Sequence, residues 1–193
     1  MSTASTAIPS DIGLQLLHLV RETAEAKIAG RPLPAMPKAD QPPLSDSRGL
    51  FVTFHVAGQL RGCIGTFVPD RPLAALVQDM TLRSLRDPRF VFNPIRQDEL
   101  AKLDVELSIL SPMWPSRDPL AEFVPGKHGL LVECDGRGGC FLPQVATETG
   151  WDGKQMLENC CQHKAGLAPD AWQRSDAAVY LFTAQIFSET PKA

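Results

Sequence analysis

Residues Leu50–Phe67 read LFVTFHVAGQLRGCIGTF, and the fold expected for the whole chain starts from this run. LFVTFHV alternates and is rich in β-branched and aromatic residues, and LRGCIGTF has the same strand-forming character. Ala57-Gly58-Gln59 stands between the two segments and predicts a tight turn. Strands joined by so short a turn pair in antiparallel fashion, so the sequence predicts a β-hairpin.

Hydrophobic periodicity predicts the other helices and strands. An apolar stripe indicates a helix over residues 10–29 with Ser10 as its cap, and a second helix is expected to start behind a cap at Asp70. The segment DVELSIL, which starts at Asp104, alternates apolar and polar residues and indicates a half-buried strand. The other predicted elements are a helical turn over 97–102, strands over 128–134, 140–142 and 177–187, a turn over 135–139, and helices from 143 and from 153 to 164.

Together these elements predict an α+β fold, built mainly of antiparallel, barrel-like sheet with flanking helices. Hairpin, helix and strand follow one another twice, and each half holds a Gly-Cys pair, at Gly62-Cys63 and Gly139-Cys140. This order predicts a pseudo-repeat of strand, hairpin, helix, helix and strand. The chain is expected to form a single domain over 1–193, with proline-rich connections near 31–49 and 111–126.

Composition and charge restrict the classes of function. The chain has 193 residues, of which 44% are hydrophobic and 21% charged, which is enough for a substantial core. The net charge of −3 and the isoelectric point near 5.8 argue against a broad nucleic-acid-binding surface, although a small basic site is compatible with them. No secretory signal or membrane-spanning run is recognisable, and the five cysteines fit reduced thiols, so a cytoplasmic protein without membrane contact is expected.

The run LRGCIG places two glycines, a cysteine and an arginine inside a predicted strand. Residues two apart share one face of a strand, so Arg61 and Cys63 are expected to point one way and Leu60 into the core. In a functional interpretation, Gly62 and Gly65 let a ligand approach the backbone. Arg61 then binds an anion, and Cys63 is a nucleophile or soft ligand. In the alternative, the run forms a β-bulge with a small buried thiol and a structural ion pair.

Three further polar residues are candidates for the same site. Arg89, in the DPRF segment that ends a helix, could supply a second positive charge for a carboxylate or phosphate, or it could cap the helix carbonyls. Glu106 lies on the polar face of its strand and is either a general base or one half of a salt bridge. His128 stands where a loop meets a strand, and it is either a general base for Cys63 or a histidine satisfied by backbone hydrogen bonds.

No metal site and no cofactor are predicted. Cys134 and Cys140 are separated by five residues around a predicted turn, and Cys160 and Cys161 are adjacent, which turns them to different sides of a helix. Neither spacing matches the usual zinc-ligand patterns. No glycine-rich phosphate-binding loop precedes a helix in the required pattern, so nucleotide-binding motifs are absent.

The motifs LRGCIGTF, DPRF, DVELSILSP, GKHGLLVE, LPQVA and CCQHKAGL occur in this order within residues 12–187. In this order they resemble the AMMECR-type domain family, whose prokaryotic members are called AmmeMemoRadiSam system protein A. The resemblance implies a compact α+β fold with two lobes and a cleft between them. The signature residues that it carries over are Arg61, Gly62, Cys63, Gly65, Asp87, Arg89, Phe90, Glu106, His128, Gly129, Pro143 and Gln144.

The resemblance attaches no firm activity to the chain, but it implies partner proteins. The prokaryotic relatives are similar to one component of a set with a Memo-type protein and a radical SAM enzyme. We therefore expect a cleft-based enzyme or accessory protein in a modification pathway, and the alternative is a non-catalytic binding module for a partner protein, an anionic small molecule or RNA. The expected catalytic residues are Cys63 and His128, and the expected binding residues are Arg61, Gly62, Gly65, Asp87, Arg89, Glu106 and Gln144. Cys140 stands where the family often has leucine, and a single cysteine is usual near Cys160-Cys161, so a catalytic role for Cys140 or Cys160 is doubtful.

Overall fold

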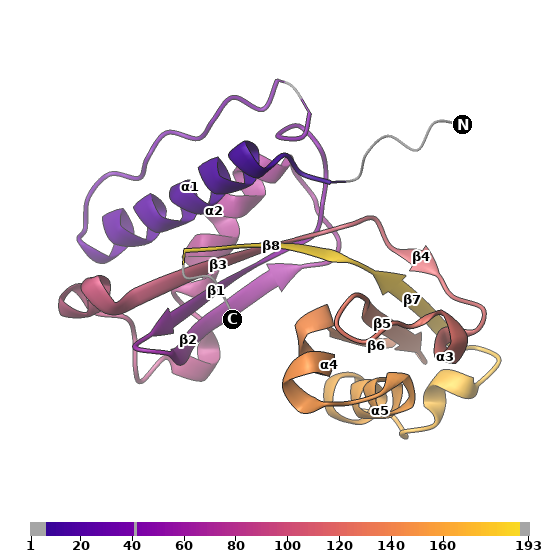
Figure 1. Cartoon of the computed structure of the whole chain (residues 1–193). Coiled ribbons are helices and arrows are strands. Elements are labelled where there is room, and N and C mark those ends of the chain that lie inside the picture. Colours follow the sequence, from indigo (N-terminus) through magenta and orange to yellow (C-terminus); the bar gives the residue numbers. More distant parts are fainter. Residues whose placement is uncertain (1–6, 41, 190–193) are drawn as a thin grey trace. The chain divides into compact units, whose positions relative to one another are not determined.

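The computed structural model of the chain describes residues 7–40 and 42–189 (Figure 1). These residues divide into two compact units, one formed by the chain up to Leu110 with the segment from Gln185 onward, and the other by Ser111–Ala184. Each unit has a four-stranded sheet and a hydrophobic core of its own. The α+β prediction is confirmed; the barrel-like description is loose, because neither sheet among the described residues closes into a barrel. The expected single domain and its cleft stay predictions.

The first unit is built on the predicted hairpin. Its elements are α1 (Ser10–Ile28), β1 (Leu50–Val56), β2 (Gln59–Thr66), α2 (Leu73–Ser84), the 3-10 helices η1 (Pro88–Phe90) and η2 (Gln97–Lys102), β3 (Leu103–Leu110) and β8 (Ala184–Ser188). The strand order is β2-β1-β3-β8, and β1 is antiparallel to both of its neighbours. Ala57 and Gly58 form the turn with positive φ angles of 49° and 78°, a backbone that glycine adopts without strain.

The second unit repeats this plan with shorter elements. They are β4 (Trp114–Pro115), α3 (Pro119–Glu122), β5 (Gly129–Cys134), β6 (Arg137–Phe141), α4 (Pro143–Thr149), α5 (Gly153–Asn159), the π-helix η3 (Cys160–Ala165), the 3-10 helix η4 (Ala171–Gln173) and β7 (Ala178–Phe182). The strand order is β4-β7-β5-β6. In both units the first strand of a hairpin therefore lies between its return strand and the strand that follows the helices, as the predicted pseudo-repeat requires.

Apolar stripes on α1 and α2 bury one face of the first sheet (Figure 1). Leu16 and Val20 of α1 and Leu73 and Val77 of α2 are fully buried, and each such side chain contributes about 1.5–3 kcal/mol of hydrophobic free energy. Neither predicted cap is right. Prolines occupy both N-cap positions, at Pro9 and Pro72, so Ser10 is already helical, while the Asp70 carboxylate pairs with Arg71 instead.

Two strand predictions need correction. β3 is buried on both faces, not one, since Glu106 and Ser108 are as inaccessible as their apolar neighbours. The single strand expected over 177–187 is two strands, β7 in the second sheet and β8 in the first. The two strands separate at Thr183. Its backbone N–H donates to the Ser111 hydroxyl, and its carbonyl accepts from the Ser111 N–H. Because both backbone groups bind Ser111, Thr183 takes no part in strand pairing.

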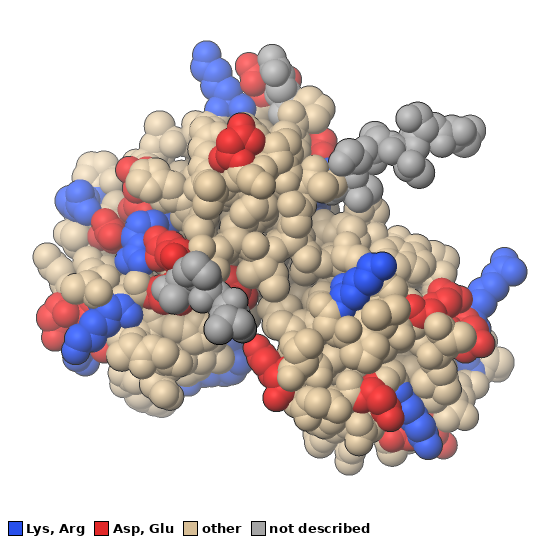
Figure 2. Space-filling model, in the orientation of Figure 1, with Lys and Arg blue, Asp and Glu red and all other residues tan. Residues whose placement is uncertain are grey.

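Among the described residues, none of the helices has both the length and the apolar character needed to cross a membrane. On the face visible in Figure 2, lysines and arginines are interspersed with aspartates and glutamates rather than gathered in one patch. This distribution agrees with the slightly acidic net charge of the whole chain.

Candidate functional site

A β-bulge at Arg61 determines the arrangement of the LRGCIG run. The register pairs Phe54 with Gly62 but His55 with Leu60, so Arg61 is the extra residue of β2. Because of the bulge, Leu60 lies on the same face of the hairpin as Cys63, and it is 38% exposed. The prediction that Leu60 enters the core is therefore wrong.

The Arg61 guanidinium is buried, and its donors are used within the first unit. It donates to both carboxylate oxygens of Glu99, at 2.9 and 3.2 Å, and to the carbonyls of Asn93 and Pro94. The hydrogen bond from Arg61, aided by the Arg96 N–H, lowers the pKa of Glu99 to about 2. These contacts match the structural ion pair of the alternative interpretation, and Arg61 fixes the segment between η1 and η2. Direct anion binding by Arg61 stays a prediction.

Cys63 is held through its side chain and through both of its backbone groups. Its sulfur accepts a hydrogen bond from the Thr53 hydroxyl at 3.3 Å. Its N–H donates to the Asp87 carboxylate at 3.0 Å, and its carbonyl accepts from Arg89 at 3.1 Å. β2 is an edge strand, so Asp87 and Arg89 supply the partners that a further strand would otherwise give. The half-buried thiol is thus fixed in position.

Asp87 and Arg89 form one tight unit beside Cys63. Asp87 is buried, and it accepts hydrogen bonds from the Arg89 backbone at 3.0 Å and from its guanidinium at 2.6 Å. Burial alone would raise the pKa of Asp87, but the bonds from Arg89 and from the Cys63 N–H outweigh it and lower that pKa. The pKa of Arg89 is raised by Asp87 and, to a smaller extent, by the Cys63 thiol. The Arg89 side chain remains 56% exposed, so it can still meet an anion.

The two glycines of the run make room for the chain's own backbone. A Cβ atom on Gly62 would lie 2.3 Å from the Ser84 carbonyl oxygen at the end of α2. On Gly65 it would lie 2.2 Å from the Leu50 carbonyl oxygen of β1. Both glycines are therefore needed for packing, and the expected approach of a ligand to their backbone stays a prediction.

A polar row crosses the sheet from Cys63. The registers pair Cys63 with Thr53 and Thr53 with Glu106, so the three side chains share one face of β2, β1 and β3. Glu106 is 3% exposed. Neighbouring strands lie about 4.8 Å apart. Cys63 and Glu106 are two strands apart, so roughly 10 Å separates their positions in the row. The row therefore places a thiol and a buried carboxyl group on the same face of the first sheet.

His128 and Gln144 belong to the second unit. The His128 Nδ1 atom lies 3.2 Å from the Val124 N–H and 3.1 Å from the Glu122 carbonyl, so it accepts from one or donates to the other according to its tautomer. Burial lowers the pKa of His128, against the smaller effect of the Glu122 carbonyl. The Gln144 side-chain oxygen is buried without a hydrogen-bond partner in the described residues. A role for His128 as base for Cys63 stays a prediction.

The remaining cysteines are less favourably placed for chemistry. The five cysteines form no disulfide. Burial raises the pKa of Cys134, Cys160 and Cys161. The ligand atoms of Cys134, Asp135 and Asp176 lie within 4.8 Å of one another, but Arg174 pairs with both carboxylates, so this group is explained by an ion-pair network.

Sequence reasoning missed Thr53, Ser84 and Glu99. An unbroken hairpin with a turn at Ala57-Gly58 would pair Thr53 with Gly62, and only the bulge brings Thr53 opposite Cys63. Ser84, at the end of α2, donates to the Val52 carbonyl and accepts from the Ile64 N–H. These bonds could be predicted only if the packing of α2 on the hairpin were already known. Glu99 accepts from the Arg96 N–H three residues earlier, but an arginine at that position has no side-chain acceptor to complete a capping box, so the sequence carried no capping signal there.

These observations define an α+β protein with a fixed cysteine at the edge of its first sheet. The chain belongs to the AMMECR1 family, whose model matches residues 17–187. A protein of Methanothermobacter thermautotrophicus is 39% identical to this chain, and the match covers 93% of this chain and 95% of that protein. A protein of Methanosarcina acetivorans is 40% identical, and the match covers 92% of this chain and 91% of that protein. The crystal structure of the uncharacterized protein PH0010 from Pyrococcus horikoshii matches 93% of this chain and 92% of its own with a TM-score of 0.82 and 36% identity. The predicted family is thereby confirmed.

Proposed function

We propose that the working site of this AMMECR1-family protein is the Cys63 end of the polar row, and that the Cys63 thiol acts there as a nucleophile or soft ligand. The observation that carries the proposal is the hydrogen bond from Thr53 to the Cys63 sulfur, with the Arg89 cation close by. The hydroxyl donor fixes the sulfur in one orientation, and the nearby Arg89 cation can hold an anionic reaction partner beside it.

Other residues take supporting parts in this proposal. Glu106 is the acid or base of the row, two strands from Cys63 on the same face of the sheet. Arg89 meets an anionic group of the substrate, because its guanidinium is partly exposed. Arg61 is a positioning residue, since its donors already hold Glu99 and the Asn93 and Pro94 carbonyls.

The biological setting is proposed from the family resemblance. The protein acts as an enzyme or accessory subunit of a modification pathway, with a Memo-type protein and a radical SAM enzyme as partners. A cytoplasmic location accompanies this setting, because reduced thiols persist there and the five cysteines form no disulfide.

Iodoacetamide labelling at neutral pH, resolved by cysteine with mass spectrometry, tests the thiol role. Cys63 should react several-fold faster than Cys140, which is also half-buried and serves as the control within the same molecule. Thr53→Val keeps the side-chain shape and removes the hydroxyl donor, so it should slow the reaction of Cys63 and leave Cys140 unchanged. Equal labelling rates for the two cysteines, with no effect of Thr53→Val, would remove the basis of the proposal.

A non-catalytic binding role is the second candidate, and the exposed loop after η1 favours it. Phe92 is fully exposed and Val91 is 64% exposed, next to the Asn93 and Pro94 carbonyls that Arg61 fixes. A rigidly presented aromatic side chain is a typical anchor for a partner protein.

Pull-down of a purified Memo-type protein distinguishes this candidate from the first. Binding should survive Cys63→Ser but be lost with Arg61→Ala or Phe92→Ser. RNA binding, the remaining alternative, requires affinity that falls as salt concentration rises.

A further inference from the structure

The second unit contains a pocket of about 580 Å³ that plays no part in the Cys63 site. Segments far apart in the sequence line it, since Pro119 and Leu120 come from α3, Trp172 from η4 and Val179 from β7. All of its lining residues belong to the same compact unit. Its volume lies in the range of roughly 300–1,000 Å³ that is usual for small-molecule sites.

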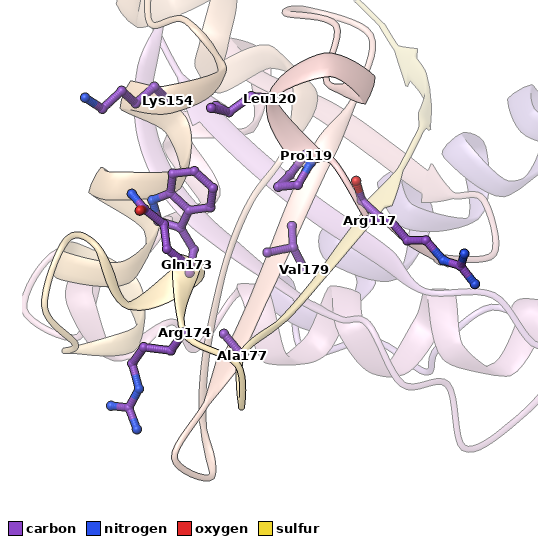
Figure 3. Close-up of a pocket in the computed structure, with 10 residues that line it drawn as sticks. Arg117, Pro119, Leu120, Lys154, Gln173, Arg174, Ala177 and Val179 are labelled. Carbon is purple, nitrogen blue, oxygen red and sulfur yellow. The ribbon is translucent and has the colours of Figure 1, made fainter.

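The inner lining of this pocket is apolar and suits a flat ring. Trp172 packs against the core of the second unit and also lines the pocket, which leaves its indole only partly buried. Figure 3 shows the side chains of Leu120, Pro119, Val179 and Ala177 placed one after another along the hollow. The indole, the proline ring and the aliphatic side chains of this lining offer apolar surfaces against which an aromatic ring can stack.

The charged lining side chains are all basic. They are Arg117, Lys154 and Arg174, and within residues 7–40 and 42–189 no aspartate or glutamate lines the pocket. Arg174 is already neutralised by Asp135 and Asp176, whereas Lys154 lies 3.6 Å from Glu158 at an exposed position. Figure 3 shows the charged ends of Arg117 and Lys154 turned outward on opposite sides of the hollow. Such long side chains can fold back over a bound anion.

We infer that this pocket, which is independent of the proposed thiol chemistry, binds a planar aromatic anion. The ring stacks on Trp172 between Pro119 and Val179, and the negative group lies at the mouth beside Lys154 or Arg117. A carboxylate supplies the negative charge in one compact planar group that guanidinium and ammonium groups bind.

Indole N–H signals in NMR spectra test the inference, because the chain has three tryptophans, at 114, 151 and 172. The Trp172 signal is assigned with Trp172→Phe, and the probe is naphthalene-2-carboxylate. We expect a saturable shift of the Trp172 signal that exceeds those of Trp114 and Trp151. Naphthalene-2-carboxamide, the neutral isostere, should bind at least about ten-fold more weakly.

Substitutions of charged side chains outside the core test the inference without disturbing the fold. Arg117→Gln and Lys154→Gln combined should weaken binding of the carboxylate at least about five-fold. Lys127→Gln removes the same kind of charge from an exposed position outside the lining and should leave affinity unchanged. The inference is overturned if the three indole signals shift alike, if the carboxamide binds equally well, or if the double variant retains full affinity.

Discussion

Arg61, the extra residue of the β2 bulge, holds Glu99 through two parallel hydrogen bonds of 2.9 and 3.2 Å. The same guanidinium holds the carbonyls of Asn93 and Pro94, so one side chain fixes most of the connection from η1 to η2. The bulge therefore serves to turn a buried cation toward a loop that has no strand partner of its own.

Replacing Arg61 should loosen that loop. We expect Arg61→Gln to lower the free energy of unfolding by roughly 2 kcal/mol, because charge-assisted hydrogen bonds of a buried group are lost. Arg71→Gln is the control, since the Arg71–Asp70 pair is exposed and its loss should change stability much less. Urea unfolding measures both changes, and equal losses in the two variants would contradict the structural role of Arg61.

Stability should depend on pH through Glu99. Its pKa is about 2 in the folded chain against an ordinary value near 4.3, so the unfolded chain takes up the proton first as pH falls. The stabilisation is complete above about pH 5 and is lost progressively between pH 5 and pH 2. Thermal unfolding followed over this range should show a shallower decline for Glu99→Gln than for the native chain. Glu158→Gln, which removes a carboxylate from the surface, should keep the native slope.

The Asp87 carboxylate should protect the Cys63 amide from hydrogen exchange. Asp87→Asn replaces a charged acceptor by a neutral one, and a hydrogen bond to a charged group is worth about 1.5–3 kcal/mol. Exchange of the Cys63 amide should therefore accelerate about ten-fold or more. Asp98→Asn alters an exposed carboxylate on η2 and serves as the control. Unchanged protection in Asp87→Asn would show that the edge of β2 does not depend on this bond.

Gly62→Ala should destabilise the chain by about 1–3 kcal/mol, the usual cost of overpacking. The added Cβ would lie 2.3 Å from the Ser84 carbonyl oxygen, so β2 or the end of α2 must move. Gly138→Ala in β6 places its Cβ no closer than 3.6 Å to any neighbour and should be nearly neutral. Chemical denaturation compares the two variants, and a neutral Gly62→Ala would mean that the α2 end yields easily.

Much of the fold could be predicted from local pattern. The alternation of LFVTFHV, the Ala57-Gly58 turn and the capping box at Asp152 all lead to elements that the structure contains. Each of these signals depends on residues a few positions apart, which a sequence displays directly.

The candidate site was predicted less well, because its contacts depend on three-dimensional register. The sequence LRGCIG does not identify Arg61 as the extra residue of a bulge. A one-residue shift in the pairing register of β1 and β2 decides whether Thr53 lies opposite Gly62 or Cys63. Glu106 was expected on a half-exposed face, but its burial depends on the tertiary structure and not on its own strand. The strand over 177–187 read as continuous because the Ser111–Thr183 bonds join distant residues.

The break at Thr183 has a consequence for how the chain is made. β8 belongs to the first sheet, yet the ribosome adds it only after the whole of the second unit. While those intervening residues are synthesised, over several seconds at ordinary rates, β3 has an open side that β8 later occupies. The nascent chain must therefore keep β2, β1 and β3 from pairing with other strands until Ala184–Ser188 emerge.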